Sequence, residues 1–135
     1  MTAIRIVVID DEPVLRLTFQ RLLEEHGYEV HVAENGQDGL ELCRDRRPDL
    51  VITDLYMPEY DGYATIECLQ EEFPDVPVIA MSAVIGPSGR QRTVNLGAVC
   101  CITKPVDMAV LLRMVEGIVK ARPEPGDEAA PVSVN

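Results

Sequence analysis

The sequence contains no long apolar run and no excess of basic residues. No stretch of the 135 residues approaches the roughly 20 apolar residues that cross a bilayer, and the N-terminus lacks the apolar core of a signal peptide. We therefore expect a cytoplasmic protein with no membrane partner. The formal net charge is −11, which leaves no basic stripe to neutralise phosphates, so we expect no nucleic-acid partner either.

The cysteine pattern indicates neither a metal centre nor a redox dithiol. The four cysteines, Cys43, Cys68, Cys100 and Cys101, have no metal-ligand spacing and form no Cys-x-x-Cys pair. Cys43 and Cys68 fall within helical apolar patterns, which favours small buried thiols. Cys100 and Cys101 are neighbours in a predicted strand, so their side chains should point to opposite faces of the sheet.

What the sequence does contain is a regular alternation of strand and helix patterns. Apolar, mainly β-branched runs predict strands at residues 4–9, 28–33, 50–54, 77–81 and 99–102. Helical patterns follow each of them, at residues 13–26, 37–46, 62–72, 90–96 and after Asp107. Such alternation predicts an α/β fold with parallel strands, right-handed crossovers and helices on both faces of the sheet.

Loop signals separate these elements. Residues 55–61 carry Pro58 and are expected to form a loop. The run Gly-Pro-Ser-Gly at 86–89 predicts that 82–89 is loop-like and that the next helix begins late. We expect one domain over residues 1–120, because a hydrophobic fraction of 47% suits one globular core. Residues 121–135 are acidic, proline-rich and without periodicity, which predicts a flexible tail.

Charged and hydroxyl groups follow the carboxyl ends of four of these strands. Asp10 and Asp11 follow the first, Asp54 ends the third, Ser82 follows the fourth and Lys104 follows the fifth. Open parallel sheets place their sites at this edge, so we expect one shared site. Three carboxylates close together repel one another, which favours a hard cation such as Mg²⁺. Aspartate can also act as a covalent nucleophile in phosphoryl transfer.

Each of these residues also has a plain structural interpretation. Asp11 could favour the N-terminus of the first helix through the macrodipole. Lys104 could be an ordinary turn residue and Ser82 a loop or cap residue. An acid such as Asp54 at the end of a buried strand is harder to explain without a use, and the joint pattern favours a functional site.

The arrangement resembles the receiver domain of two-component response regulators. The matching segments are VVIDDEP at 7–13, DLYMPEYDG at 54–62, SA at 82–83, and GA at 97–98 followed by TKP at 103–105. The resemblance covers about residues 3–120. It implies a flavodoxin-like (βα)5 fold, doubly wound, with a five-stranded parallel sheet in the order 2-1-3-4-5.

The resemblance also implies a metal site. Asp11 and Asp54 would bind Mg²⁺ directly, and Asp10 would act mainly through water. The backbone carbonyl of Tyr56 would complete the protein ligands, without its side chain. Mg²⁺ is then the expected cofactor.

For the phosphoryl group the resemblance implies three residues. Asp54 would accept it, Lys104 would pair with it, and Ser82 would hydrogen-bond it. The Lys104–Pro105 peptide bond is cis in many relatives. The protein would be a signalling switch rather than an enzyme, catalysing only its own phosphorylation and dephosphorylation.

The same resemblance implies the partners. A sensor histidine kinase or a phosphotransfer protein would donate the phosphoryl group. A downstream protein effector would bind the face formed by the last two helices and the fifth strand, and a homodimer is left open. One departure stands out: relatives usually carry an aromatic residue where this chain has Cys101. We therefore expect activation to depend more on residues 82–97.

Three other interpretations remain. The chain could be a receiver module from a hybrid kinase or a longer regulator. An aspartyl-phosphate phosphohydrolase of the haloacid-dehalogenase type would need a second aspartate where Tyr56 stands. A flavodoxin-like flavin-binding module would need a Ser/Thr/Gly-rich phosphate loop where this chain has Asp10, Asp11 and Glu12.

Overall fold

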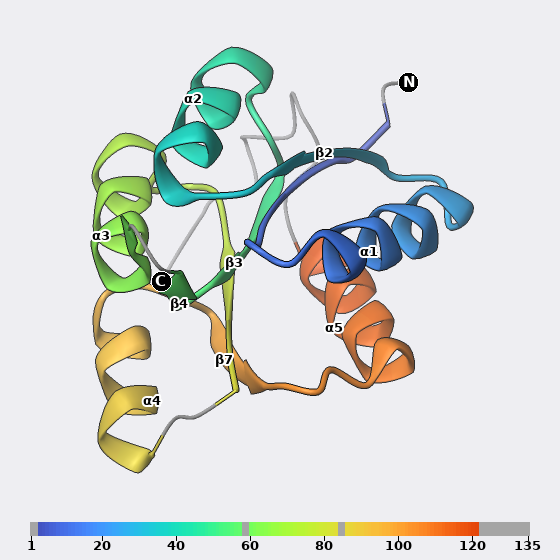
Figure 1. Cartoon of the computed structure of the whole chain (residues 1–135). Coiled ribbons are helices and arrows are strands. Elements are labelled where there is room, and N and C mark those ends of the chain that lie inside the picture. The colour runs from blue at the N-terminus through green and yellow to red at the C-terminus, as the bar shows by residue number, and fades with distance from the viewer. Residues whose placement is uncertain (1–2, 58–59, 84–85, 122–135) are drawn as a thin grey trace.

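The computed structural model describes residues 3–57, 60–83 and 86–121. At its centre lies a five-stranded parallel sheet in the spatial order β2-β1-β3-β6-β7 (Figure 1). Its strands are β1 (Arg5–Ile9), β2 (Glu29–Ala33), β3 (Leu50–Asp54), β6 (Val78–Ser82) and β7 (Cys100–Thr103). This confirms the predicted flavodoxin-like order, with the second strand at an edge.

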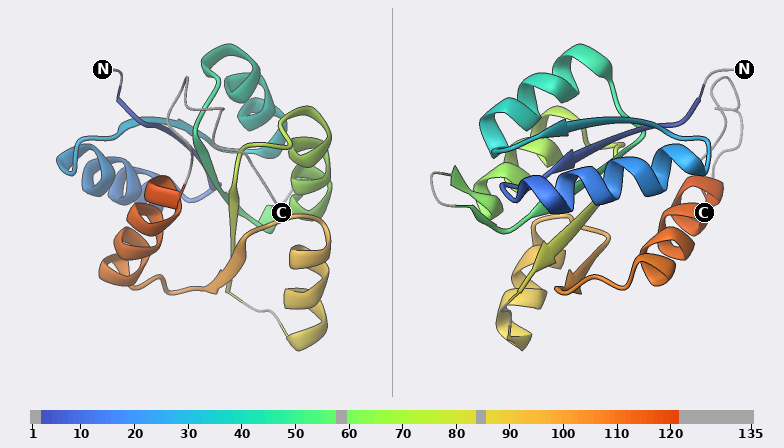
Figure 2. Two further views of the ribbon diagram at one scale, coloured as in Figure 1. Left: turned by 180° about the vertical axis from the view of Figure 1, so that it is seen from behind. Right: turned by 45° about the vertical axis from the view of Figure 1, so that its right-hand side comes forward.

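Five helices cover both faces of this sheet. They are α1 (Pro13–Glu25), α2 (Gly36–Arg46), α3 (Gly62–Glu72), α4 (Pro87–Asn95) and α5 (Met108–Ala121). Helices α1 and α5 lie on one side, and α2, α3 and α4 lie on the other (Figures 1 and 2). No helix within the described residues is long and apolar enough to span a membrane.

The alternating faces of β1 show how the sequence builds two core layers. Ile6 and Val8 pack in the cluster that includes residues of α1 and α5. Val7 and Ile9 pack in the cluster that includes residues of α2 and α3. All four side chains are fully buried, as expected of a strand covered on both faces.

The neighbouring cysteines follow the same rule. The Cys101 side chain belongs to the α2–α3 layer and the Cys100 side chain packs against the α1–α5 layer. This confirms that the two thiols point to opposite faces. All four cysteines are free, and Cys43 is fully buried.

Glycines end two of the helices. Gly27 after α1 and Gly97 after α4 have positive φ values of 91° and 112°. The next amide in each case donates back into the last turn, from Tyr28 to the Leu23 carbonyl and from Ala98 to the Thr93 carbonyl. These are Schellman motifs, which satisfy carbonyls that the helix leaves unpaired.

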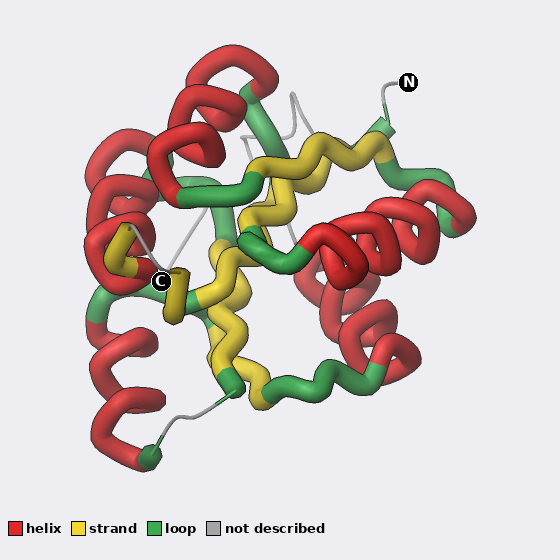
Figure 3. The backbone as a smooth tube through the Cα atoms, viewed as in Figure 1, coloured by secondary structure: helices red, strands yellow, loops and turns green. Residues whose placement is uncertain are grey.

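Two local predictions were wrong. Residues 55–61, expected to be a loop, contain the short antiparallel strands β4 (Tyr56–Met57) and β5 (Tyr60–Asp61). Helix α4 begins at Pro87, because Gly86 serves as N-cap and proline fits the first helical turn. Figure 3 shows both features in the secondary-structure colouring. Pro58 and nearly all of the predicted tail lie outside the described residues.

Candidate phosphorylation and metal site

The candidate site lies where the predicted strand-end residues meet. Asp54 is the last residue of β3, Ser82 is the last residue of β6, and Asp10 directly follows β1. Lys104 directly follows β7. Because β1, β3, β6 and β7 are consecutive in the sheet, their carboxyl ends bring these residues to one edge.

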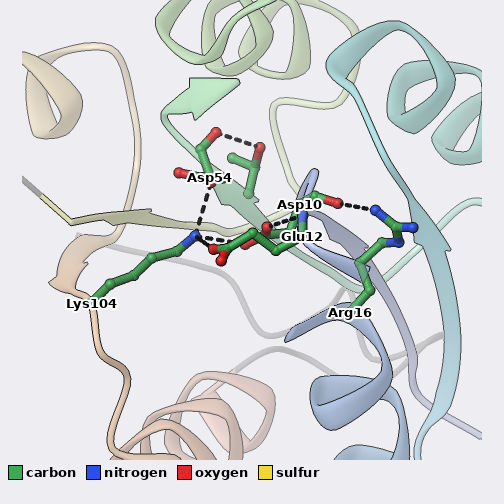
Figure 4. A network of polar contacts seen from close by, with 6 residues as sticks. Asp10, Glu12, Arg16, Asp54 and Lys104 are labelled. Atoms are coloured by element: carbon green, nitrogen blue, oxygen red, sulfur yellow. Dashed lines mark hydrogen bonds and ion pairs between the residues drawn. The ribbon is translucent and has the colours of Figure 1, made fainter. Parts of the chain in front are cut away.

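Lys104 is the centre of the polar network at this edge. Its Nζ donates to Asp10 Oδ2 and Asp54 Oδ2, both at 2.9 Å, and to Glu12 Oε1 at 3.0 Å (Figure 4). Asp10 is fully buried and Asp54 is 4% exposed, whereas the Glu12 side chain is 61% exposed. The ammonium therefore joins two interior carboxylates to one at the surface.

Asp10 is held in place by further contacts. Its Oδ1 accepts the backbone N–H of Glu12 at 2.8 Å. Its backbone carbonyl accepts a hydrogen bond from the Arg16 guanidinium at 2.7 Å (Figure 4). The first turn of α1 thus fixes the carboxylate that faces Lys104.

Burial and pairing shift the ionisation of this network in a consistent direction. Burial raises the pKa of Asp10, although the Glu12 amide and Lys104 oppose the rise. Burial lowers the pKa of Lys104, but hydrogen bonds to Asp10, Asp54 and Glu12 outweigh it, so this pKa is raised overall. Lys104 therefore carries a positive charge at neutral pH. In Asp10, by contrast, burial disfavours the ionised form of the carboxyl.

The acidic residues fit a metal ion. One carboxylate oxygen each from Asp10, Asp11 and Asp54 lie within 4.8 Å of one another. Asp11 is partly exposed and the other two are buried. A cluster of carboxylate oxygens is the kind of ligand set that suits Mg²⁺, a hard cation that prefers oxygen ligands.

The remaining predicted residues lie close by in the fold. The Ser82 side chain is fully buried, and its carbonyl accepts the Lys104 amide at 2.8 Å. Asp54 pairs in register with Met81, the residue before Ser82. Tyr56 begins the short strand β4, two residues beyond Asp54. The Lys104–Pro105 bond is cis, as the resemblance implied.

Sequence reasoning missed two residues of the network, Glu12 and Arg16. Glu12 was named only within the segment 7–13 that resembles receiver domains and in weighing a flavin site, and Arg16 was not singled out. The available signal was position: Glu12 follows the acidic pair directly, and Arg16 lies one helical turn after Glu12. Long side chains reach their partners in ways that spacing alone does not specify.

Comparison with known proteins identifies the family of this chain. The family model of the response regulator receiver domain matches residues 6–116. The chain belongs to the response regulator receiver domain family. Protein PilH of Pseudomonas aeruginosa is 34% identical over 116 residues, covering 84% of this chain and 96% of that protein. The response regulator MprA of Mycolicibacterium vanbaalenii is 32% identical, covering 93% of this chain and 54% of that protein.

Solved structures agree on the fold. The chemotaxis protein CheY4 of Vibrio cholerae superposes with a TM-score of 0.82 at 23% identity, covering 87% of this receiver domain and 99% of that chain. A BeF3-activated DrrB receiver domain superposes with a TM-score of 0.81 at 24% identity, covering 88% of this chain and 99% of that one. The family is one of signalling switches in two-component systems.

Proposed function

We propose that this receiver domain accepts a phosphoryl group on Asp54 and thereby switches its binding to a protein partner. The observation that carries the proposal is the environment of the Asp54 carboxylate. It is buried at a strand end, 2.9 Å from Lys104 Nζ and within one cluster with Asp10 and Asp11. A nucleophile, a fixed cation and a metal-binding acid pair are the parts that phosphoryl transfer needs.

The proposed donor is a phosphohistidine on a histidine kinase or a phosphotransfer protein. A carboxylate oxygen of Asp54 forms the new P–O bond as the P–N bond breaks, and the bonding electron pair remains on the imidazole nitrogen. Lys104 and Ser82 are proposed to hold the oxygens of the transferred group. The phosphoryl group thus passes from the histidine to Asp54 without any further reactant.

Mg²⁺ is the proposed cofactor. Asp10, Asp11, Asp54 and the Tyr56 carbonyl are its proposed ligands, with Asp10 acting mainly through water. When bound, the ion supplies positive charge that offsets the negative charge of the phosphoryl oxygens. The proximity of the three carboxylates, whose oxygens lie within 4.8 Å of one another, supports this assignment.

The proposed effector surface is formed by α4, β7 and α5. It rests on family resemblance, as does the proposal that the chain acts as a switch rather than as an enzyme. The chain spans nearly all of PilH and about half of MprA. A stand-alone regulator is the favoured proposal, and a receiver module within a longer regulator or hybrid kinase is the alternative.

The test is to replace Asp54→Asn and measure phosphorylation by a small-molecule phosphodonor with Mg²⁺, read by intact mass spectrometry. We expect the labelling to be abolished, because the amide is not a nucleophile. The matched control is Asp75→Asn, which alters an exposed aspartate between α3 and β6 and should label normally. Undiminished labelling of Asp54→Asn would sink the proposal.

A further inference from the structure

Helix α4 is held to the domain mainly by polar contacts. Of its nine residues, all of them described, only Thr93 is buried. The Thr93 hydroxyl donates to the Arg90 carbonyl at 2.7 Å, within the helix itself. Val94, the large apolar side chain of this helix, is 47% exposed. A helix with so little apolar burial has low local stability, so single polar contacts decide where it sits.

Two arginines attach α4 to two different elements. The Arg92 guanidinium lies over the Tyr63 ring of α3, 4.0 Å from its centroid. Arg90 Nη1 donates to the Cys101 carbonyl of β7 at 2.7 Å, and Arg90 Nη2 donates to Thr103 Oγ1. We call Arg90 with these two acceptors the Arg90 latch. Figure 1 shows α4 beside α3 and next to β7.

The Arg90 latch ends beside the candidate phosphorylation site. Thr103 directly precedes Lys104 and pairs in register with Ser82. The Lys104 amide donates to the Ser82 carbonyl at 2.8 Å. A backbone movement of Ser82 or Lys104 toward a phosphoryl group on Asp54 would therefore also displace Thr103, which Arg90 contacts. Hydrogen bonds weaken steeply when their distance or angle departs from the optimum.

Cys101 leaves room for this arrangement. It stands on the strand segment that Arg90 spans, and its small side chain packs in the α2–α3 layer. Residues 101–103, the segment of β7 that Arg90 spans, are Cys, Ile and Thr, so none of them carries an aromatic ring.

We propose that Arg90 is a positioning residue that couples the location of α4 to the state of the phosphorylation site. The Arg90 latch is closed in the observed arrangement, where Lys104 contacts Asp54 directly, and it opens when the phosphoryl group draws Ser82 and Lys104 inward. This rests on the proposed phosphorylation of Asp54. Contacts that favour the unphosphorylated arrangement lower the affinity of the site for a phosphoryl mimic. Removing these contacts should therefore raise that affinity.

The test measures binding of beryllium fluoride with Mg²⁺, the phosphoryl mimic, by titration calorimetry. We expect Arg90→Ala to bind about fivefold more tightly than the unmodified chain, at the low end of typical coupling energies. Arg90→Lys should also bind more tightly, because an ammonium keeps the charge but not the planar fork. Gln91→Ala is the matched control: among the described residues, the Gln91 side chain donates to Asn95 of its own helix, so this variant should leave the affinity unchanged.

A second measurement follows amide hydrogen exchange in residues 86–97. We expect faster exchange in Arg90→Ala without the mimic, and the same increase in the unmodified chain when the mimic is added. Thr103→Val removes one acceptor and should be non-additive with Arg90→Ala. Unchanged affinity and unchanged exchange in Arg90→Ala, Arg90→Lys and Thr103→Val would overturn the proposed role of Arg90. If the unmodified chain does not bind the mimic, the proposed function itself is wrong, which is a separate outcome.

Discussion

At the scale of single residues, the site shows which side chains a sequence can identify. Asp10, Asp54 and Lys104 were predicted because each ends or follows a predicted strand, and strand ends have a fixed place in a parallel sheet. Glu12 was not predicted as a partner of Lys104 Nζ, at 3.0 Å. Its backbone position belongs to a helix start, and only the conformation of its side chain brings it to the lysine.

Asp10 gives a prediction at this scale. Burial raises the pKa of Asp10, which means that its ionised form is disfavoured in the folded protein. We expect Asp10→Asn to raise the free energy of unfolding at pH 7 in the absence of Mg²⁺, because the amide removes a buried negative charge while Lys104 keeps its hydrogen bonds to Asp54 and Glu12. Urea unfolding with a chelator present measures the difference.

The pH dependence of this difference identifies its cause. A carboxyl whose folded pKa is raised destabilises the fold above that pKa and not below the unfolded value near 3.8. The advantage of Asp10→Asn should therefore shrink as the pH falls toward 4. Asp10→Ala is the control, because it leaves the Glu12 amide without its 2.8 Å acceptor and should gain less. An advantage independent of pH would contradict this account.

At the scale of elements, the errors of sequence reasoning have a common origin. Glycine and proline mark both loops and helix ends, so the segment 86–89 was assigned to a loop although Pro87 opens α4. Strands β4 and β5 contain two residues each, too few for any periodicity to reveal. Elements with a buried face, such as β3 and α3, were predicted with the observed boundaries.

The start of α5 offers a prediction at this scale. Asp107 Oδ1 accepts the backbone N–H groups of Ala109 at 3.0 Å and Val110 at 3.2 Å, as expected of an N-cap. We expect Asp107→Ala to lower the free energy of unfolding by about 1 kcal/mol, measured by urea denaturation. Asp107→Asn keeps the acceptor and should lose only a few tenths of that amount. Equal losses in the two variants would show that the cap does not stabilise α5.

At the scale of the whole molecule, the fold class followed from the alternation of patterns, but the order of strands did not. Alternating runs predict a parallel sheet with helices on both faces. They do not specify which strands are neighbours, because β1, β3 and β6 all consist mainly of apolar residues. The order was predicted through the resemblance to receiver domains, and the structure confirms it.

Mg²⁺ could stabilise this strongly negative protein in two ways: by binding a specific site, or by screening the repulsion among its negative charges. The net charge is −11, so any cation relieves some repulsion. A specific site adds about 1.4 kcal/mol of stability for each tenfold rise of Mg²⁺ above its dissociation constant. We expect the free energy of unfolding, measured with urea at constant ionic strength, to rise with Mg²⁺ concentration in this way. The rise should be lost in Asp11→Asn, which removes one carboxylate of the cluster. Glu41→Gln, an exposed acid on α2, should keep it. Equal responses in both variants would mean that Mg²⁺ acts only through the overall charge.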